Sequence, residues 1–132
     1  MRQAMSSSER RKYPRVKVYY PISYVGMNEN GRIVQESMGV ALDISQGGIL
    51  IETAVGVFSK YIKLISTDYN NNIIEIKGKV AYCKRTQSEK YRTGISFAGS
   101  HAQNINFAKK LIKSYHYKKS ENRYNAGAQR LI

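Results

Sequence analysis

The stretch GVALDISQGGILIE, residues 39–52, contains two runs of alternating side chains separated by a pair of glycines. Such alternation predicts strands that bury one face and expose the other. The residues expected to face the core are Val40, Leu42, Ile44, Ile49 and Ile51. Ala41, Asp43 and Ser45 are then expected to project from the outer face, next to Gly47 and Gly48. Paired glycines permit positive φ and let a ligand approach the backbone, although a tight turn with a local Asp or Ser hydrogen bond explains the same residues.

Strand patterns also occur on both sides of this stretch. Six short strands are expected in all, at residues 15–25, 33–44, 48–52, 61–66, 73–82 and 91–97. Pro21, in the first of them, has no amide donor and is expected at an edge or a bulge. The loop GMNENGR, residues 26–32, is expected to be a hairpin turn. Turn signals about every ten residues favour an antiparallel barrel or sandwich.

The chain changes character after the last expected strand. Apolar residues recur at helical spacing from His101 onward: Ile105, Phe107, Ala108, Leu111, Ile112 and Tyr115. Lys109, Lys110 and Lys113 lie off that stripe, so we expect an amphipathic helix that caps or flanks the strands. The expected organisation is a disordered leader at residues 1–8, one domain at residues 9–117 that includes the helix, and a basic, weakly ordered tail at residues 118–132.

The formal charge of the 132-residue chain is +13 and is concentrated at its two ends. Residues 1–20 contain six basic groups and one acid, and residues 109–132 contain seven and one. Basic ends suit an anionic partner, which can be a nucleic acid, a phosphate-bearing small molecule, an acidic protein or a membrane surface. Terminal cations that simply keep a small domain soluble are the alternative.

Several classes of function are disfavoured by the composition. One cysteine and two distant histidines form no metal-binding cluster. No apolar run approaches the roughly 20 residues of a membrane span, and the N-terminus has no apolar signal segment, so a cytoplasmic location is expected. The acids are scattered, no catalytic triad is present, and residues 26–32 lack the Lys and Ser/Thr of a phosphate-binding loop. We therefore expect a protein that is not an enzyme and has no cofactor.

Two short motifs stand out against this background. ERRKYPR, residues 9–15, contains an R-x-x-x-R element through Arg11 and Arg15. DISQGG, residues 43–48, fits [D/N]-x-S-x-x-G through Asp43, Ser45 and Gly48. In this order on a six-strand pattern, the motifs resemble the PilZ domain, the bacterial receptor module for cyclic di-GMP. YRTGISF, residues 91–97, is similar to the closing strand of that family, and the resemblance extends over residues 9–115.

The resemblance implies an all-β fold, a six-stranded antiparallel β-barrel with a C-terminal α-helix. It also implies that the arginine-bearing N-terminal segment folds over cyclic di-GMP on the outer surface of the barrel. The motifs imply that Arg11, Arg15, Asp43, Ser45 and Gly48 bind the ligand. We expect Arg10, next to the first motif, and Gly47, within the second, to bind it as well. Members of this family bind the ligand singly or as an intercalated pair, and the extra guanidinium of Arg10 leads us to expect two molecules per chain. The signal is expected to pass to an unidentified protein partner in trans.

A small basic β-barrel that binds single-stranded nucleic acid is the alternative. The charge and the many tyrosines, which can stack on bases, favour it. Against it, the spacing of Tyr82, Tyr91 and Tyr115 predicts buried side chains, and the central part of the chain is nearly neutral.

Overall fold

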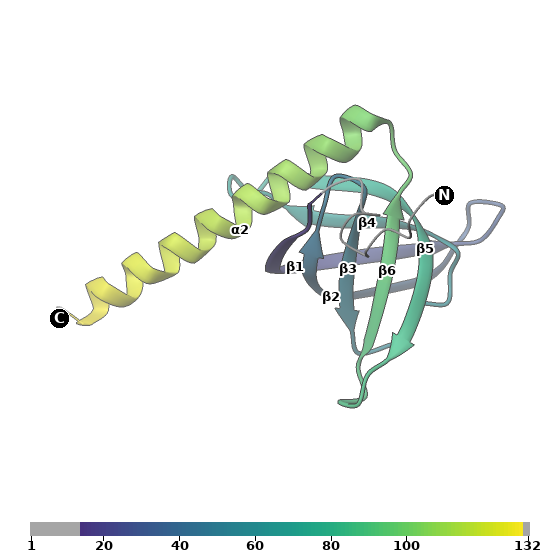
Figure 1. The fold of residues 1–132 in the computed structure, drawn as a ribbon, viewed down its shortest axis with the longest axis horizontal. Helices are drawn as coiled ribbons and strands as arrows, with labels where there is room; N and C mark the ends of the chain where they lie inside the picture. Colours follow the sequence, from purple (N-terminus) through teal and green to yellow (C-terminus); the bar gives the residue numbers. More distant parts are fainter. Residues whose placement is uncertain (1–13, 131–132) are drawn as a thin grey trace, which may run out of the picture.

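The computed structural model describes the backbone of residues 14–130 and the side chains of residues 14–121. Six antiparallel strands close into a barrel in the order β1-β2-β3-β6-β5-β4, and a helix follows them (Figure 1). The elements are β1 (Val16–Met27), β2 (Ile33–Ile44), β3 (Gly48–Thr53), β4 (Tyr61–Thr67), β5 (Ile73–Arg85), β6 (Tyr91–Phe97) and α2 (His101–Arg130). The expected six-stranded barrel with a C-terminal helix is confirmed.

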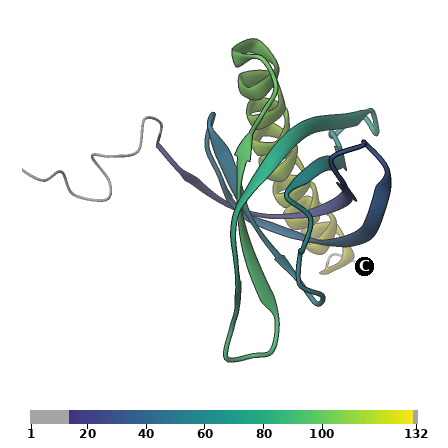
Figure 2. The same ribbon diagram turned by 90° about the vertical axis from the view of Figure 1, so that its right-hand side faces the viewer.

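Three hairpins turn through the same five-residue geometry. In each, the side-chain oxygen of the first residue accepts a hydrogen bond from the N–H of the fifth; the first residues are Asn28, Asp68 and Thr86. The fourth residue has a positive φ, at Gly31 (78°), Asn71 (63°) and Glu89 (64°). The first of these turns confirms the hairpin expected at residues 26–32. The β5–β6 hairpin projects well beyond the rest of the barrel (Figures 1 and 2).

Helix α2 contributes to the core of the barrel. Phe107, Ala108 and Leu111 are buried in the same cluster as the inward side chains of the strands. The N–H of Tyr69, in the β4–β5 turn, donates to Oγ of the buried Ser114 at 3.1 Å. The helix continues to Arg130, beyond residue 117, and its C-terminal part extends away from the barrel (Figure 1). Within the described residues, no helix is both long and apolar enough to cross a membrane.

Two irregularities in the strands change which side chains face inward. The β2–β3 register passes from Ala41↔Ile51 to Asp43↔Leu50 and so skips Leu42. Ala41 is therefore buried, and the expectation that Val40 and Leu42 face the core is wrong. One extra residue in a strand reverses the alternation that a plain strand would have.

The second irregularity lies in β5. The β5–β6 register skips Ala81 between Val80 and Tyr82. Tyr82 is consequently 47% exposed, and the expectation that it is a core residue is wrong. Tyr115 packs against the core as expected. Pro21 pairs with Val40 next to a third irregularity between Lys17 and Tyr20, as its missing amide donor predicted.

Candidate ligand-binding site

The start of β1 and the end of β2 lie side by side, which brings the two sequence motifs together. Lys17 is opposite Asp43 in the β1–β2 register. Nη1 of Arg15 lies 2.5 Å from Oδ1 of Asp43, and the two side chains are 35% and 22% exposed. Arg15 and Asp43 are thus in contact at the outer surface of the barrel although 28 positions separate them.

The turn after β2 is closed by its own polar groups. The N–H of Ser45 donates to the carbonyl of Gly48 at 2.9 Å, and the N–H of Gly47 donates to Oγ of Ser45 at 3.2 Å. Ser45 is only 8% exposed, so the expectation that it projects from the outer face beside Asp43 is wrong. The chain leaves the strand at Ser45, and its hydroxyl stabilises the turn. The local Ser hydrogen bond of a tight turn is therefore present.

The two glycines of this turn have different roles. A Cβ on Gly48 would lie 2.5 Å from the carbonyl oxygen of Ile95, so only glycine lets β3 approach β6 this closely. Gly47 is exposed, and its carbonyl accepts from the N–H of Phe97 at 2.9 Å. The positive φ that the glycine pair suggested is not found, because Gly31 is the only glycine with positive φ within residues 14–130.

Beyond Asp43, an outer row of residues crosses four strands. Asp43 is opposite Leu50, Leu50 is opposite Gly94, and Gly94 is opposite Tyr82. At about 4.8 Å per strand, the row is about 14 Å long. A Cβ on Gly94 would lie 2.3 Å from Cε1 of Tyr82, so the aromatic ring covers the glycine. The sequence did not lead us to predict this outer row of residues. Gly94, a glycine inside the last strand, was the signal that could have indicated it.

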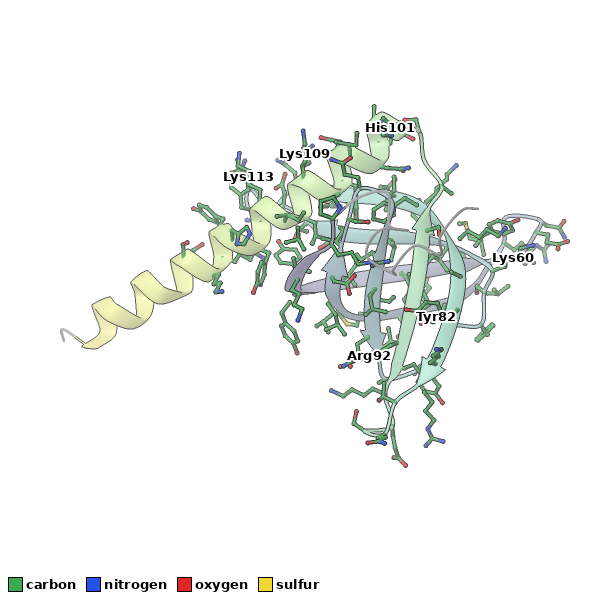
Figure 3. The ribbon with its side chains drawn as sticks, in the orientation of Figure 1. Lys60, Tyr82, Arg92, His101, Lys109 and Lys113 are labelled. Carbon is green, nitrogen blue, oxygen red and sulfur yellow. The ribbon has the colours of Figure 1, made fainter. Side chains whose placement is uncertain are left out.

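Cations border this outer face. Nζ of Lys84 lies 5.5 Å from the centre of the Tyr82 ring. Arg92 is neutralised by Glu52, with Nε and Oε2 3.2 Å apart, whereas Lys17 has no carboxylate partner among the side chains described. Figure 3 shows Tyr82 and Arg92 on the same side of the molecule. This face therefore combines a positive charge, an acceptor at Asp43 and an exposed aromatic ring.

Arg10 and Arg11 lie outside the described residues. Among the residues that are described, no group of three His, Cys, Asp or Glu side chains could hold a metal ion.

Comparison with known families gives one match. The family model described as PilZ domain matches residues 9–115. This range contains both sequence motifs and all six strands. No curated protein matches the chain.

Solved structures with the same fold include three that are informative. The PilZ domain of YcgR from Escherichia coli, determined with c-di-GMP, is 14% identical with a TM-score of 0.57, covering 86% of this chain and 97% of that chain. MrkH from K. pneumonia in complex with c-di-GMP is 18% identical with a TM-score of 0.57, and the match covers 86% of this chain and 54% of MrkH. The inhibitor of motility MotI/DgrA of Bacillus subtilis is 20% identical with a TM-score of 0.57, and the match covers 79% of this chain and 50% of MotI/DgrA. The chain thus spans about half the length of MrkH and MotI, and at these identities the similarity establishes the fold.

Proposed function

The chain belongs to the PilZ domain family, and on that premise we propose that it is a cytoplasmic receptor for cyclic di-GMP. The contact between Arg15 and Asp43 carries the proposal, because it unites the two motifs at one place on the outer face of the barrel. No catalytic step is proposed, since the role requires binding alone.

The chemistry of these residues fits the ligand. Each guanine of cyclic di-GMP presents O6 and N7 as acceptors on one edge and N1–H and N2–H as donors on another. The planar fork of arginine matches O6 and N7, or a phosphate, with two hydrogen bonds. The carboxylate of Asp43 can accept from N1–H and N2–H. Gly47, exposed beside it, leaves the backbone open to the ligand.

The ion pair between Arg15 and Asp43 does not prevent either side chain from binding the ligand. Both side chains are partly exposed, and such pairs contribute about 0–1 kcal/mol. A bidentate contact to a base contributes about 1–3 kcal/mol. Replacing the internal pair by contacts to the ligand is therefore favourable, and the pair holds both groups near their binding positions beforehand.

Arg10 and Arg11 are proposed to close over the ligand as the N-terminal segment becomes ordered. Three to five contacts of about 1–3 kcal/mol each can offset the ordering cost and leave an affinity near 1 μM, or about −8 kcal/mol. The ligand would then be held between the leader and the outer face, with Ser45 and Gly48 maintaining the turn that positions Asp43.

We further propose that two molecules bind per chain. A pair carries four phosphates instead of two and needs more cations and more stacking surface. Arg10 supplies a cation, and the row from Asp43 to Tyr82 extends the surface by about 14 Å. Titration at protein concentrations well above Kd should give two ligands for the wild type and one for Arg10→Leu. A one-to-one endpoint in both proteins would contradict the pair.

Calorimetric titration with cyclic di-GMP tests the receptor function itself. GTP, cyclic di-AMP and a single-stranded oligonucleotide are titrated separately into the same protein for comparison. We expect binding of cyclic di-GMP alone, lost in Asp43→Ala and retained in Lys63→Ala, whose cation lies on β4. Binding of the oligonucleotide alone would instead support the nucleic-acid barrel.

The signal is proposed to leave through a protein partner in trans. Lys109 and Lys113 are exposed on helix α2 (Figure 3), with Nζ of Lys113 5.3 Å from the centre of the Tyr69 ring in the β4–β5 turn. This exposed basic face is available to such a partner.

A further inference from the structure

A cluster of apolar side chains is exposed around the β1–β2 hairpin. Phe58, in the loop between β3 and β4, is 71% exposed. Met27 is opposite Ile33 in one strand pair and opposite Tyr61 in the other, and both of these neighbours are exposed. We call Met27, Ile33, Phe58 and Tyr61 the distal apolar patch. Lys60, labelled in Figure 3, marks its position on the side of the barrel remote from the end of helix α2.

The loop that carries Phe58 is fastened to the barrel. The N–H of Phe58 donates to Oε1 of Gln35 at 3.2 Å, and Nε2 of Gln35 donates to the carbonyl of Gly56 at 2.8 Å. Ser59 is buried against Gly26, where a Cβ would lie 2.1 Å from its Oγ. Phe58 is therefore held in an exposed position by the two hydrogen bonds to Gln35 and by the burial of Ser59, which follows it.

A groove of about 290 Å³ adjoins the patch. Met27, Tyr61, Ile62, Gly78 and Ala98 supply its apolar lining. The groove is concave and apolar, and the exposed ring of Tyr61 lines it. Such a site accommodates a protruding apolar side chain of a partner better than it accommodates a flat partner surface.

Cations surround the patch. Nζ of Lys60 lies 5.5 Å from the centre of the Tyr61 ring, Lys79 is opposite Tyr61 in the β4–β5 register, and Arg32 precedes Ile33. None of these three cations forms an ion pair with another described side chain. Glu29 is the acid that lines the groove. The charge around the patch is therefore positive. A partner segment that carries carboxylates would be complementary to it.

We propose that the distal apolar patch and its groove bind an acidic segment of a partner protein, which covers Phe58 and inserts one apolar side chain into the groove beside Tyr61. This inference deepens the proposed function, because it names the surface that meets the partner. Ile33 and Asp43 are ten residues apart on β2, about 30 Å, so ligand and partner can bind together. A second copy of this chain fits poorly. Contact between two such patches would place Lys60 and Lys79 of one copy near the same two lysines of the other, and these like charges repel.

A library of 12-residue peptides displayed on phage and selected against the wild-type protein without nucleotide tests the proposal. We expect enriched peptides with an apolar residue flanked by Asp or Glu. Measured by fluorescence anisotropy, their affinity should fall at least tenfold in Phe58→Ala and in the double variant Lys60→Glu, Lys79→Glu. Met38→Ala, which removes an exposed apolar side chain outside the patch, should leave the affinity unchanged. Peptides with Lys in place of the acids should regain affinity for the double variant.

Four outcomes would overturn the proposal: failure to enrich any peptide, peptide binding that survives Phe58→Ala, dimerisation in light scattering that Phe58→Ala abolishes, and co-sedimentation with phosphatidylglycerol vesicles that Phe58→Ala abolishes. The third would assign the patch to a second copy, and the fourth to a lipid surface. Cyclic di-GMP titration of the same variants separates the two hypotheses, because loss of the patch function leaves nucleotide binding intact.

Discussion

Arg15 and Asp43 are ion-paired across the β1–β2 hairpin, with Nη1 and Oδ1 2.5 Å apart. The pair joins the residue that ends the arginine motif to the residue that begins the turn motif. It forms because the β1–β2 register places Lys17 opposite Asp43, so the residue before β1 reaches the same carboxylate. The predictions on ligand binding follow from this contact.

Arg11→Ala and Arg15→Ala should each weaken cyclic di-GMP binding at least tenfold, about 1.4 kcal/mol. Both residues precede the first strand, and an exposed pair such as Arg15–Asp43 adds about 0–1 kcal/mol to stability. The melting temperature of the ligand-free protein should therefore change by less than about 4 °C. Calorimetry and thermal melts measure both effects. Wild-type affinity in both variants would remove the arginine assignment.

Asp43→Asn should retain partial binding, and Asp43→Ala should lose most of it. Guanine N1–H and N2–H need an acceptor oxygen, which an amide still provides and a methyl group does not. Titration of the two variants side by side gives the comparison. Equal losses would point to the charge of Asp43, or to its pairing with Arg15, as the property that matters.

Gly48→Ala should destabilise the protein by about 1–3 kcal/mol, because the new Cβ would overlap a backbone carbonyl that cannot move without distorting β6. Gly94→Ala is the matched control on the same barrel face. There the new Cβ meets the ring of Tyr82, which is exposed and can rotate toward solvent, so a smaller loss is expected. Urea unfolding gives both values, and a larger loss for Gly94→Ala would contradict the distinction.

Truncation after Tyr117 should change cyclic di-GMP affinity by no more than about threefold, some 0.7 kcal/mol. The shortened helix keeps the buried Leu111 and the hydrogen bond between Ser114 and the β4–β5 turn. It loses the placement of the Lys118 ammonium 5.2 Å from the centre of the Tyr20 ring. A larger loss of affinity in calorimetry would place the C-terminal residues in the binding site.

Asp68→Asn should make the stability less sensitive to acid. The N–H groups of Asn72 and Asn70 donate to the carboxylate and lower the pKa of Asp68 in the folded state. A lowered folded pKa means that the stabilisation is complete above the unfolded pKa, about 4, and is lost as the pH falls through the folded value. Asn28 makes the equivalent hydrogen bonds with an amide oxygen, so the variant can keep the turn.

Thermal melts from pH 5 to pH 2.5 test this dependence. The wild type should lose more melting temperature than Asp68→Asn over that interval. Parallel curves for the two proteins would show that Asp68 does not titrate in the folded state as its hydrogen bonds imply.

The amino-acid sequence by itself determined the six strands, the helix after them and the two motifs that meet at Arg15 and Asp43. These features depend on local alternation, turn residues and spacing, which are readable one segment at a time. Antiparallel hairpins then bring neighbouring strands together, so the meeting of the two motifs also followed from their separation by a single hairpin.

Only the tertiary structure decided which side chains face outward before Leu42 in β2 and after Ala81 in β5. Each of these residues is an extra residue against its partner strand, and a bulge is a relation between two strands that no single segment displays. For the same reason the exposure of Tyr82, the need for glycine at position 48 and the position of Met27 between Ile33 and Tyr61 depend on barrel closure. Closure sets which distant backbones touch, and that contact determines burial.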